Sequence, residues 1–271
     1  RMGARSDILV AVCLAGAQLC ARALPQWCTQ DFKARWPAFV AIPNGPSPDN
    51  LLPFDMLGFQ EVATGIHNAG SACYMATAFQ LLVSVPELLK AAADVNSAPN
   101  ATAECARKVV ADFGGIYATH AYNDNWPVPH VLAVDLQSKL RALSEEVCPE
   151  KHIFLANMPD DAGLALATIL QMAQADGAEV QQVLGTWDGK HLTLGAKVVL
   201  YRPATETPGC EQEKPWGGAL LVLKSFAVFG GGHWWAVVRV AGLWVKINDL
   251  ELTSIAAPPS SAARVCVYTV F

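Results

Sequence analysis

Hydrophobic positions follow two different periods along this chain. In the first half, apolar residues recur at helical spacing, which predicts amphipathic helices. The predicted helices run from Cys73 to a break or kink at Pro86, cover 103–117 and 130–147, and begin again after the capping pair Asp160 and Asp161. From about residue 190 onward, apolar and polar residues alternate, which predicts strands over 192–202, 219–229, 233–240, 243–249 and 264–271. Helices first and strands second predict an α+β fold with an antiparallel sheet.

A proline-rich stretch divides the chain. Residues 41–55 hold four prolines, which is typical of a linker or an extended surface segment. We therefore predict an N-terminal segment, residues 1–50, and one folded domain, residues 51–271. The apolar run Ile8–Ala17 is too short to span a bilayer. It is either a helix, which favours a cytoplasmic or nuclear protein, or a secretory signal.

Composition narrows the function classes. The chain has 271 residues, 16% of them charged, and a formal net charge of -5. The sequence contains no basic run, which argues against a nucleic-acid partner. Its eight cysteines include no C-x-x-C pair, so we expect neither a zinc site nor any other metal. We expect these cysteines to be free thiols, most of them buried.

The stretch Gly65–Leu82, GIHNAGSACYMATAFQLL, sets a single cysteine between a small-residue turn and an apolar run. Cys73 is then either a small core residue at the start of a helix or a nucleophile. A cysteine nucleophile needs a base, and the base needs a third group that orients it. Among the six histidines, His233 has the most distinctive setting, because three glycines precede it and a predicted strand follows it.

The residues after His233 predict a β-hairpin that supplies the third group. A two-residue turn at Ala241–Gly242 pairs Trp235 with Asn248. Side chains two positions apart on a strand share a face, so Asn248 is then within reach of the imidazole. A hydrogen bond between the ring and this partner would fix the tautomer of the imidazole. A three-residue turn would select Asp249 instead, so Asp249 stays as the alternative.

These stretches resemble the sequence boxes of the ubiquitin-specific proteases, a family of papain-like cysteine proteases. The cysteine box is matched at Gly65, Asn68, Gly70, Cys73, Tyr74, Met75, Gln80 and Leu82. The histidine box is matched at Gly232, His233, Ala236, Arg239, Trp244, Asn248 and Asp249. The stretch Pro159–Ala173 is a weaker match to a box that lies between them, with Asp161, Ala162 and the leucine spacing kept. The matches follow the family's order and cover roughly residues 60–255.

The resemblance implies a papain-like fold in which a helical thumb packs on an antiparallel palm sheet, with reduced fingers. It implies that Cys73 is the nucleophile, at a helix N-terminus where the helix dipole lowers the thiol pKa. It further implies that His233 is the general base and that Asn248 or Asp249 orients it. Asn68 matches the position that donates a side-chain amide to the oxyanion.

The implied partner is ubiquitin or a ubiquitin-like protein and its conjugates, and no cofactor is implied. Ubiquitin-like tails end in Gly-Gly, so Gly231, Gly232, Trp234 and Trp235 are candidates for a narrow substrate cleft. Ser71-Ala72 replaces the family's usual Asn-Thr, which keeps open a catalytically inactive binding module. Two further alternatives are a protease for another ubiquitin-like modifier and a secreted papain-like peptidase, which would carry disulfides.

Overall fold

The change of period at mid-chain corresponds to a change from helices to strands. The computed structural model describes residues 24–37, 51–53, 62–124, 127–147, 153–155, 158–175, 179–185, 192–204, 208–256 and 260–271. Its helical elements are η1 (Gln26–Thr29), α2 (Phe32–Arg35), α4 (Cys73–Val83), α5 (Pro86–Ala93), η4 (Val95–Ser97), α6 (Ala101–Thr119), η5 (His120–Asp124), α7 (His130–Val147), α8 (Ala162–Met172) and η6 (Ser260–Ala262). The predicted break is present, since α4 ends at Val83 and Pro86 begins α5.

The strands form one sheet with a mixed character. They are β1 (Val180–Gly185), β2 (Val198–Pro203), β3 (Glu213–Trp216), β4 (Ala219–Gly230), β5 (His233–Val240), β6 (Leu243–Asn248), β7 (Glu251–Ile255) and β8 (Ala263–Val270). The order is β1-β2-β8-β4-β5-β6-β7, with β3 paired to β4. All pairings are antiparallel except β1 with β2, which is parallel. The five predicted strands pair with one another antiparallel, as expected, and the parallel pairing involves β1, a strand that the sequence pattern does not predict.

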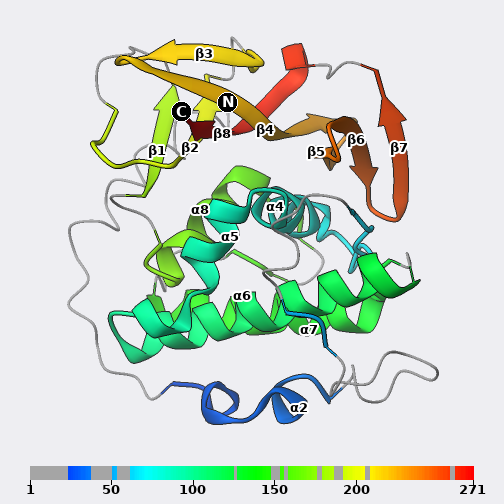
Figure 1. The fold of residues 1–271 in the computed structure, drawn as a ribbon. Coiled ribbons are helices and arrows are strands. Elements are labelled where there is room, and N and C mark those ends of the chain that lie inside the picture. The colour runs from blue at the N-terminus through cyan, green and yellow to red at the C-terminus, as the bar shows by residue number, and fades with distance from the viewer. Residues whose placement is uncertain are drawn as a thin grey trace.

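The helices cover one face of the sheet in successive layers (Figure 1). Helix α4 packs against β5 and against α8, and α6 and α7 lie beneath them. Every residue of α4 is buried. A large apolar cluster fills the space between the helices and the sheet. A second apolar cluster, which includes Phe226 and Trp244, is formed mostly by strand residues that alternate along the chain with those of the first cluster. The α+β arrangement of helices packed on a sheet, which the sequence predicts, is confirmed.

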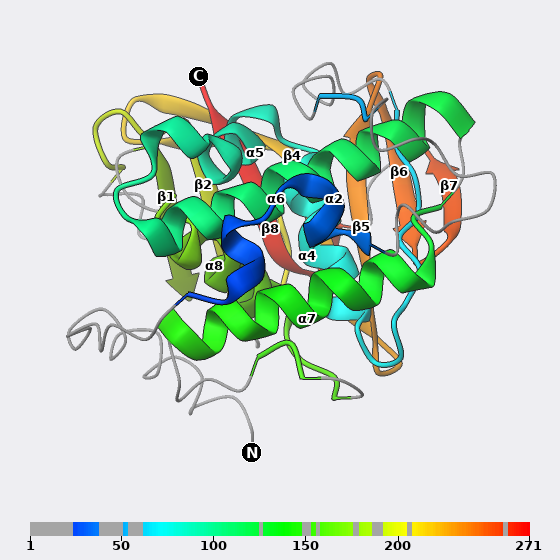
Figure 2. The same ribbon diagram turned by 90° about the horizontal axis from the view of Figure 1, so that it is seen from below.

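Residues 24–37 pack on the side of the helices that faces away from the sheet (Figure 2). Arg35 forms an ion pair with Asp112 of α6, with Nε and Oδ2 separated by 2.6 Å. The ammonium of Lys139 on α7 lies 4.1 Å from the ring centroid of Trp36. The part of the N-terminal segment that the structure describes is thus attached to α6 and α7. The run Ile8–Ala17 and residues 41–50 lie outside the described residues.

Two disulfides take up four of the eight cysteines that the sequence leads us to expect as free thiols. Cys28 is bonded to Cys105, and Cys210 is bonded to Cys266. Among the cysteines in the described residues, Cys73 is the one free thiol. The expectation of free thiols is wrong for these four residues, because partners 77 and 56 positions apart in sequence meet only in the folded chain. The first bond attaches η1 to α6.

A search of the described helices for a stretch that could cross a bilayer finds none that is both long and apolar enough.

Candidate active site

Cys73 is the first residue of α4, as the sequence predicts. Only 4% of its surface is exposed. Burial raises the pKa of the Cys73 thiol, and a hydrogen bond from the backbone of Trp234 opposes that shift. The negative charge of Asp249 raises the pKa further. The lowered thiol pKa that we expect from the helix dipole is therefore not found, because the loss of solvation outweighs the favourable backbone contacts.

The hairpin that follows His233 has the predicted register. Val240 pairs with Leu243 across the two-residue turn, and the pairing continues in the same register as far as Ala236 and Ile247. The turn residues Ala241 and Gly242 have φ of 47° and 82°, the left-handed values that a tight hairpin turn requires. The expected contact follows from this register: Nε2 of His233 lies 2.8 Å from Oδ1 of Asn248.

Asp249 also reaches His233, which the strand alternation did not predict. Its Oδ2 lies 3.6 Å from Nε2 of His233, a separation that makes an ion pair when the ring is protonated. Asp249 follows the last residue of β6 and has φ of 52°. This left-handed conformation takes the residue out of the alternation that would have sent its side chain to the opposite face. Asn248 and Asp249 are therefore both neighbours of the imidazole, with Asn248 closer.

Asn68 joins the same group through the nitrogen of its side-chain amide. Its Nδ2 donates to Oδ2 of Asp249 at 3.3 Å, and its Oδ1 accepts from the backbone N–H of Ala72 at 3.0 Å. A side-chain amide nitrogen carries two N–H groups. One is directed at Asp249, and no hydrogen bond occupies the second among the described residues.

The contacts of the His233 ring in the described residues are made at Nε2. Nε2 of His233 faces Asn248 and Asp249, which leaves Nδ1 as the ring nitrogen outside these contacts. No hydrogen bond joins the thiol to this ring within the described residues. The thiol instead meets the backbone of Trp234, the residue after His233. The contacts are thus continuous from Asn68 through Asp249 and His233 to Asn248. Cys73 lies next to this array, because its thiol contacts the backbone of Trp234, the residue that follows His233.

The glycines before His233 form a turn. Gly231 and Gly232 connect β4 to β5 with φ of 60° and 79°, and Gly230 pairs with His233 across that turn. The backbone conformation therefore accounts for glycine at both turn positions. This short turn places His233 at the first position of β5.

The two tryptophans after His233 lie on different faces of the sheet. Trp234 is buried in the cluster between the helices and the sheet, and its indole N–H donates to the carbonyl of Asp160 at 2.9 Å. Trp235 packs against the second cluster, where the ammonium of Lys246 lies 4.9 Å from its ring centroid. The tryptophans therefore do not form two walls of a single cleft.

The weak middle box, Pro159–Ala173, consists of α8 and the residues that flank it. Asp161 caps α8 by accepting from the N–H of Leu164 at 2.7 Å, and it also accepts from Arg202 of β2 at 2.9 Å. Its neighbour Asp160 holds the indole of Trp234. The sequence predicts the cap but not the contacts to β2 and β5, because those partners are distant in sequence and the spacing of residues does not indicate which of them meet. In the part of the chain that the structure describes, there is no group of three or more histidine, cysteine, aspartate or glutamate side chains that could hold a metal ion.

Comparisons with known proteins identify the fold. A structure of the SAGA DUB module of Ubp8, Sgf11, Sus1 and Sgf73 bound to monoubiquitin superposes on this chain with a TM-score of 0.50 and 13% identity, covering 77% of this chain and 69% of that chain. The same module bound to ubiquitin aldehyde, and the module with a Ubp8 variant, each give a TM-score of 0.47 and 14% identity, covering 77% of this chain and 69% and 68% of theirs. No family model and no curated protein sequence matches the chain. The first likeness shows a ubiquitin-protease-like fold.

Proposed function

We propose that this chain is a thiol-dependent deubiquitinase, which hydrolyses the isopeptide or peptide bond after the C-terminal Gly-Gly of ubiquitin. One observation carries the proposal. Asn68, Asp249, His233 and Asn248 form a continuous polar array beside the helix N-terminus that bears Cys73. A nucleophile, a base, an orienting group and an amide donor are the parts that acyl transfer requires.

Burial of Cys73 defines the first step of the proposed reaction. Because burial raises the pKa of the thiol, the resting nucleophile is protonated and must lose its proton to a base. His233 accepts that proton at Nδ1 as the thiolate attacks the carbonyl carbon of the terminal glycine. The oxygen of Asn248 holds the N–H at Nε2, which fixes the tautomer and stabilises the imidazolium.

The free N–H of Asn68 then stabilises the oxyanion. The N–H of Cys73 at the start of α4 is a second donor. A donor of this kind contributes about 2.7–4 kcal/mol of transition-state stabilisation. His233 returns its proton to the leaving amine as the C–N bond breaks, which leaves a thioester on Cys73. Water then attacks the thioester, His233 takes a proton from the water, and the thiol is regenerated with release of the carboxylate.

The choice of ubiquitin as substrate rests on the fold. The structural neighbour with the similar fold is described as bound to monoubiquitin. Gly231 and Gly232 lie next to His233, and Phe229, which is 44% exposed, lies with its ring centroid 5.0 Å from that of Trp234. We propose that these residues border the path of the Gly-Gly tail. Trp235 packs against the second cluster, so we expect it to support the strand and not to contact the tail.

An activity-based probe tests the proposal. Ubiquitin that carries a C-terminal electrophile should form a covalent adduct with the protein, and Cys73→Ala should abolish it. The exposed variant Glu87→Gln on α5 is the matched control and should label like the parent. Labelling by a different ubiquitin-like tail alone would identify another modifier. A folded protein that no such probe labels would overturn both versions, and the inactive binding module would then be tested by binding of unmodified ubiquitin.

The disulfides favour a second candidate, a general papain-like peptidase of an oxidising compartment. Disulfides form and persist in such compartments and are rare in the cytosol. Cys28–Cys105 and Cys210–Cys266 are what this candidate predicts. It requires labelling by a small peptidyl epoxide and cleavage of unfolded peptides without Gly-Gly. A protein that reacts with the ubiquitin probe and leaves such peptides intact excludes it.

A further inference from the structure

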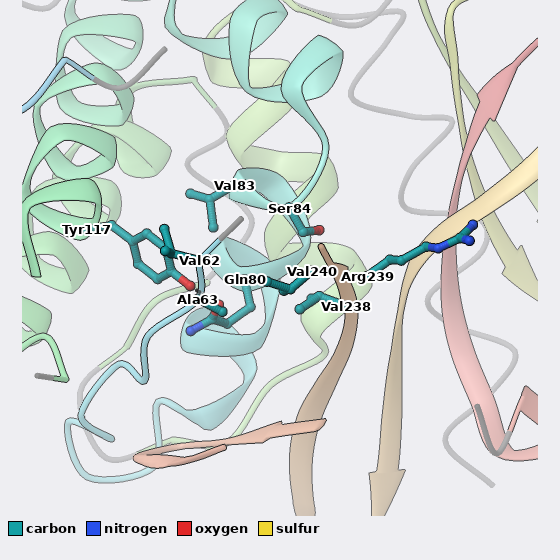
Figure 3. Close-up of a pocket in the computed structure, with 9 residues that line it drawn as sticks. All are labelled: Val62, Ala63, Gln80, Val83, Ser84, Tyr117, Val238, Arg239 and Val240. Carbon is teal, nitrogen blue, oxygen red and sulfur yellow. Dashed lines mark hydrogen bonds between the residues drawn. The ribbon is translucent and has the colours of Figure 1, made fainter. Parts of the chain in front are cut away.

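Three buried residues close a polar ring behind the site. The hydroxyl of Tyr117 on α6 donates to Oε1 of Gln80 on α4 at 2.8 Å. Nε2 of Gln80 donates to the carbonyl of Thr64 at 2.7 Å, and the N–H of Thr64 donates to the Tyr117 hydroxyl at 3.0 Å. Figure 3 shows the side chains of Gln80 and Tyr117 beside residues of the segment that leads to Thr64. Each member contacts both others, and all three are buried.

The ring holds the backbone of Thr64 by its N–H and its carbonyl. The next residues lie directly against the turn that carries Asp249. The N–H of Ile66 donates to the carbonyl of Asp249 at 3.1 Å, and a Cβ added to Gly65 would lie 2.5 Å from that same oxygen. On its other side, Gly65 accepts from the N–H of Val128 at 2.8 Å. The segment is therefore packed tightly against the turn and is hydrogen-bonded to it.

The same segment carries Asn68, so the ring is linked to two members of the site, Asn68 and Asp249. From Thr64 the chain reaches Asn68 in four residues, and Asn68 meets the side chain of Asp249. Asp249 in turn lies beside His233. A displacement of Thr64 would change how Asn68 and Asp249 approach the imidazole. Tyr117 and Gln80 themselves have no contact with His233 among the described interactions.

We propose that Gln80 and Tyr117 are positioning residues for the reaction: through Thr64 and Ile66 they hold Asn68 and Asp249 in place against His233. The inference rests on the proposed function for its catalytic consequence, but the structural relationship stands independently. Buried polar networks in which every member is paired hold one arrangement, because an unpaired member is costly.

The test compares two tyrosine-to-phenylalanine variants. Tyr117→Phe removes the hydroxyl that holds Thr64 and Gln80 while keeping the ring, and Tyr268→Phe makes the same deletion in the second cluster of the sheet. On a ubiquitin substrate, Tyr117→Phe should lower kcat by about 10- to 100-fold with KM changed by less than about twofold. Tyr268→Phe should leave kcat within about twofold of the parent even at an equal loss of Tm. Equal kcat in the two variants, at matched Tm, would overturn the proposal.

A second measurement does not depend on activity. The amide of Ile66, which donates to Asp249, should exchange with solvent deuterium at least about tenfold faster in Tyr117→Phe than in Tyr268→Phe. Unchanged exchange would overturn the inference, whatever the enzyme's activity. An inactive parent protein with the expected exchange difference would instead refute the proposed function alone and leave the positioning relationship established.

Discussion

The side-chain amide of Asn68 donates to the carboxylate of Asp249 at 3.3 Å, across 181 positions of sequence. The contact links the segment before Cys73 to the turn after the hairpin that carries His233. Asp249 also lies beside His233, so one carboxylate contacts both the amide donor and the imidazole. Asp249 therefore has a place in the site without replacing Asn248.

Asn248 should matter more than Asp249 for turnover. Its oxygen is 2.8 Å from Nε2 of His233, whereas the Asp249 oxygen is 3.6 Å away. We expect Asn248→Ala to lower kcat by about 100-fold or more and Asp249→Ala to lower it less. Asn248→Asp keeps an acceptor at the same position and should recover part of the loss. Steady-state kinetics on a ubiquitin substrate decide the order, and the reverse order would identify Asp249 as the main orienting group.

Asn68 and Asp249 should behave as a unit. Asn68→Ala removes the proposed oxyanion donor, and we expect kcat to fall by about 10²- to 10³-fold. Because Asp249 orients that donor, the Asn68→Ala/Asp249→Ala double variant should lose less than the sum of the two single losses. A double-mutant cycle in ΔΔG‡ measures this coupling. Additive losses would show that Asp249 acts on His233 alone.

Stability should fall in alkaline solution. Burial raises the pKa of Tyr74 to about 12, above an ordinary tyrosine value of about 10. Above the ordinary value the unfolded chain has lost a proton that the native state keeps. The free energy of unfolding therefore falls as pH rises from the ordinary tyrosine pKa through the pKa of Tyr74 in the folded protein. The stabilisation by Tyr74 is fully present below the ordinary pKa. Urea unfolding at several pH values measures this fall.

The fall should be smaller in Tyr74→Phe, because phenylalanine carries no ionisable hydroxyl. Burial also raises the pKa of Tyr117 and Tyr268, so part of the alkaline loss should remain in that variant. An unchanged pH dependence in Tyr74→Phe would assign the whole effect to other groups.

The bond between Cys28 and Cys105 should stabilise the helical half. It closes a loop whose ends are 77 positions apart, and removing a native disulfide typically costs about 2–5 kcal/mol. We expect Cys28→Ser and Cys105→Ser to lower the free energy of unfolding equally, with no further loss in the double variant. Peptide mapping without reductant should recover the two cysteines in one cross-linked fragment. Separate fragments from native protein would contradict the pairing.

Local patterns accounted for much of this structure. The start of α4 at Cys73, the cap at Asp161 and the register of β5 on β6 all depend on residues close together in sequence. Strands β1, β3 and β7 were not predicted. Strand β7, Glu251–Ile255, is exposed at nearly every position, so no alternation of burial marks it.

The sequence by itself determined that a cysteine begins a helix and that a two-residue turn brings Asn248 to His233. Turn chemistry and the period of side chains along a strand are local properties, and they need no knowledge of the rest of the chain. Only the tertiary structure decided the cysteine pairs, the approach of Asn68 to Asp249, and the raised pKa of Cys73. Each of these depends on burial or on distant segments meeting, and both follow from how the helices pack on the sheet.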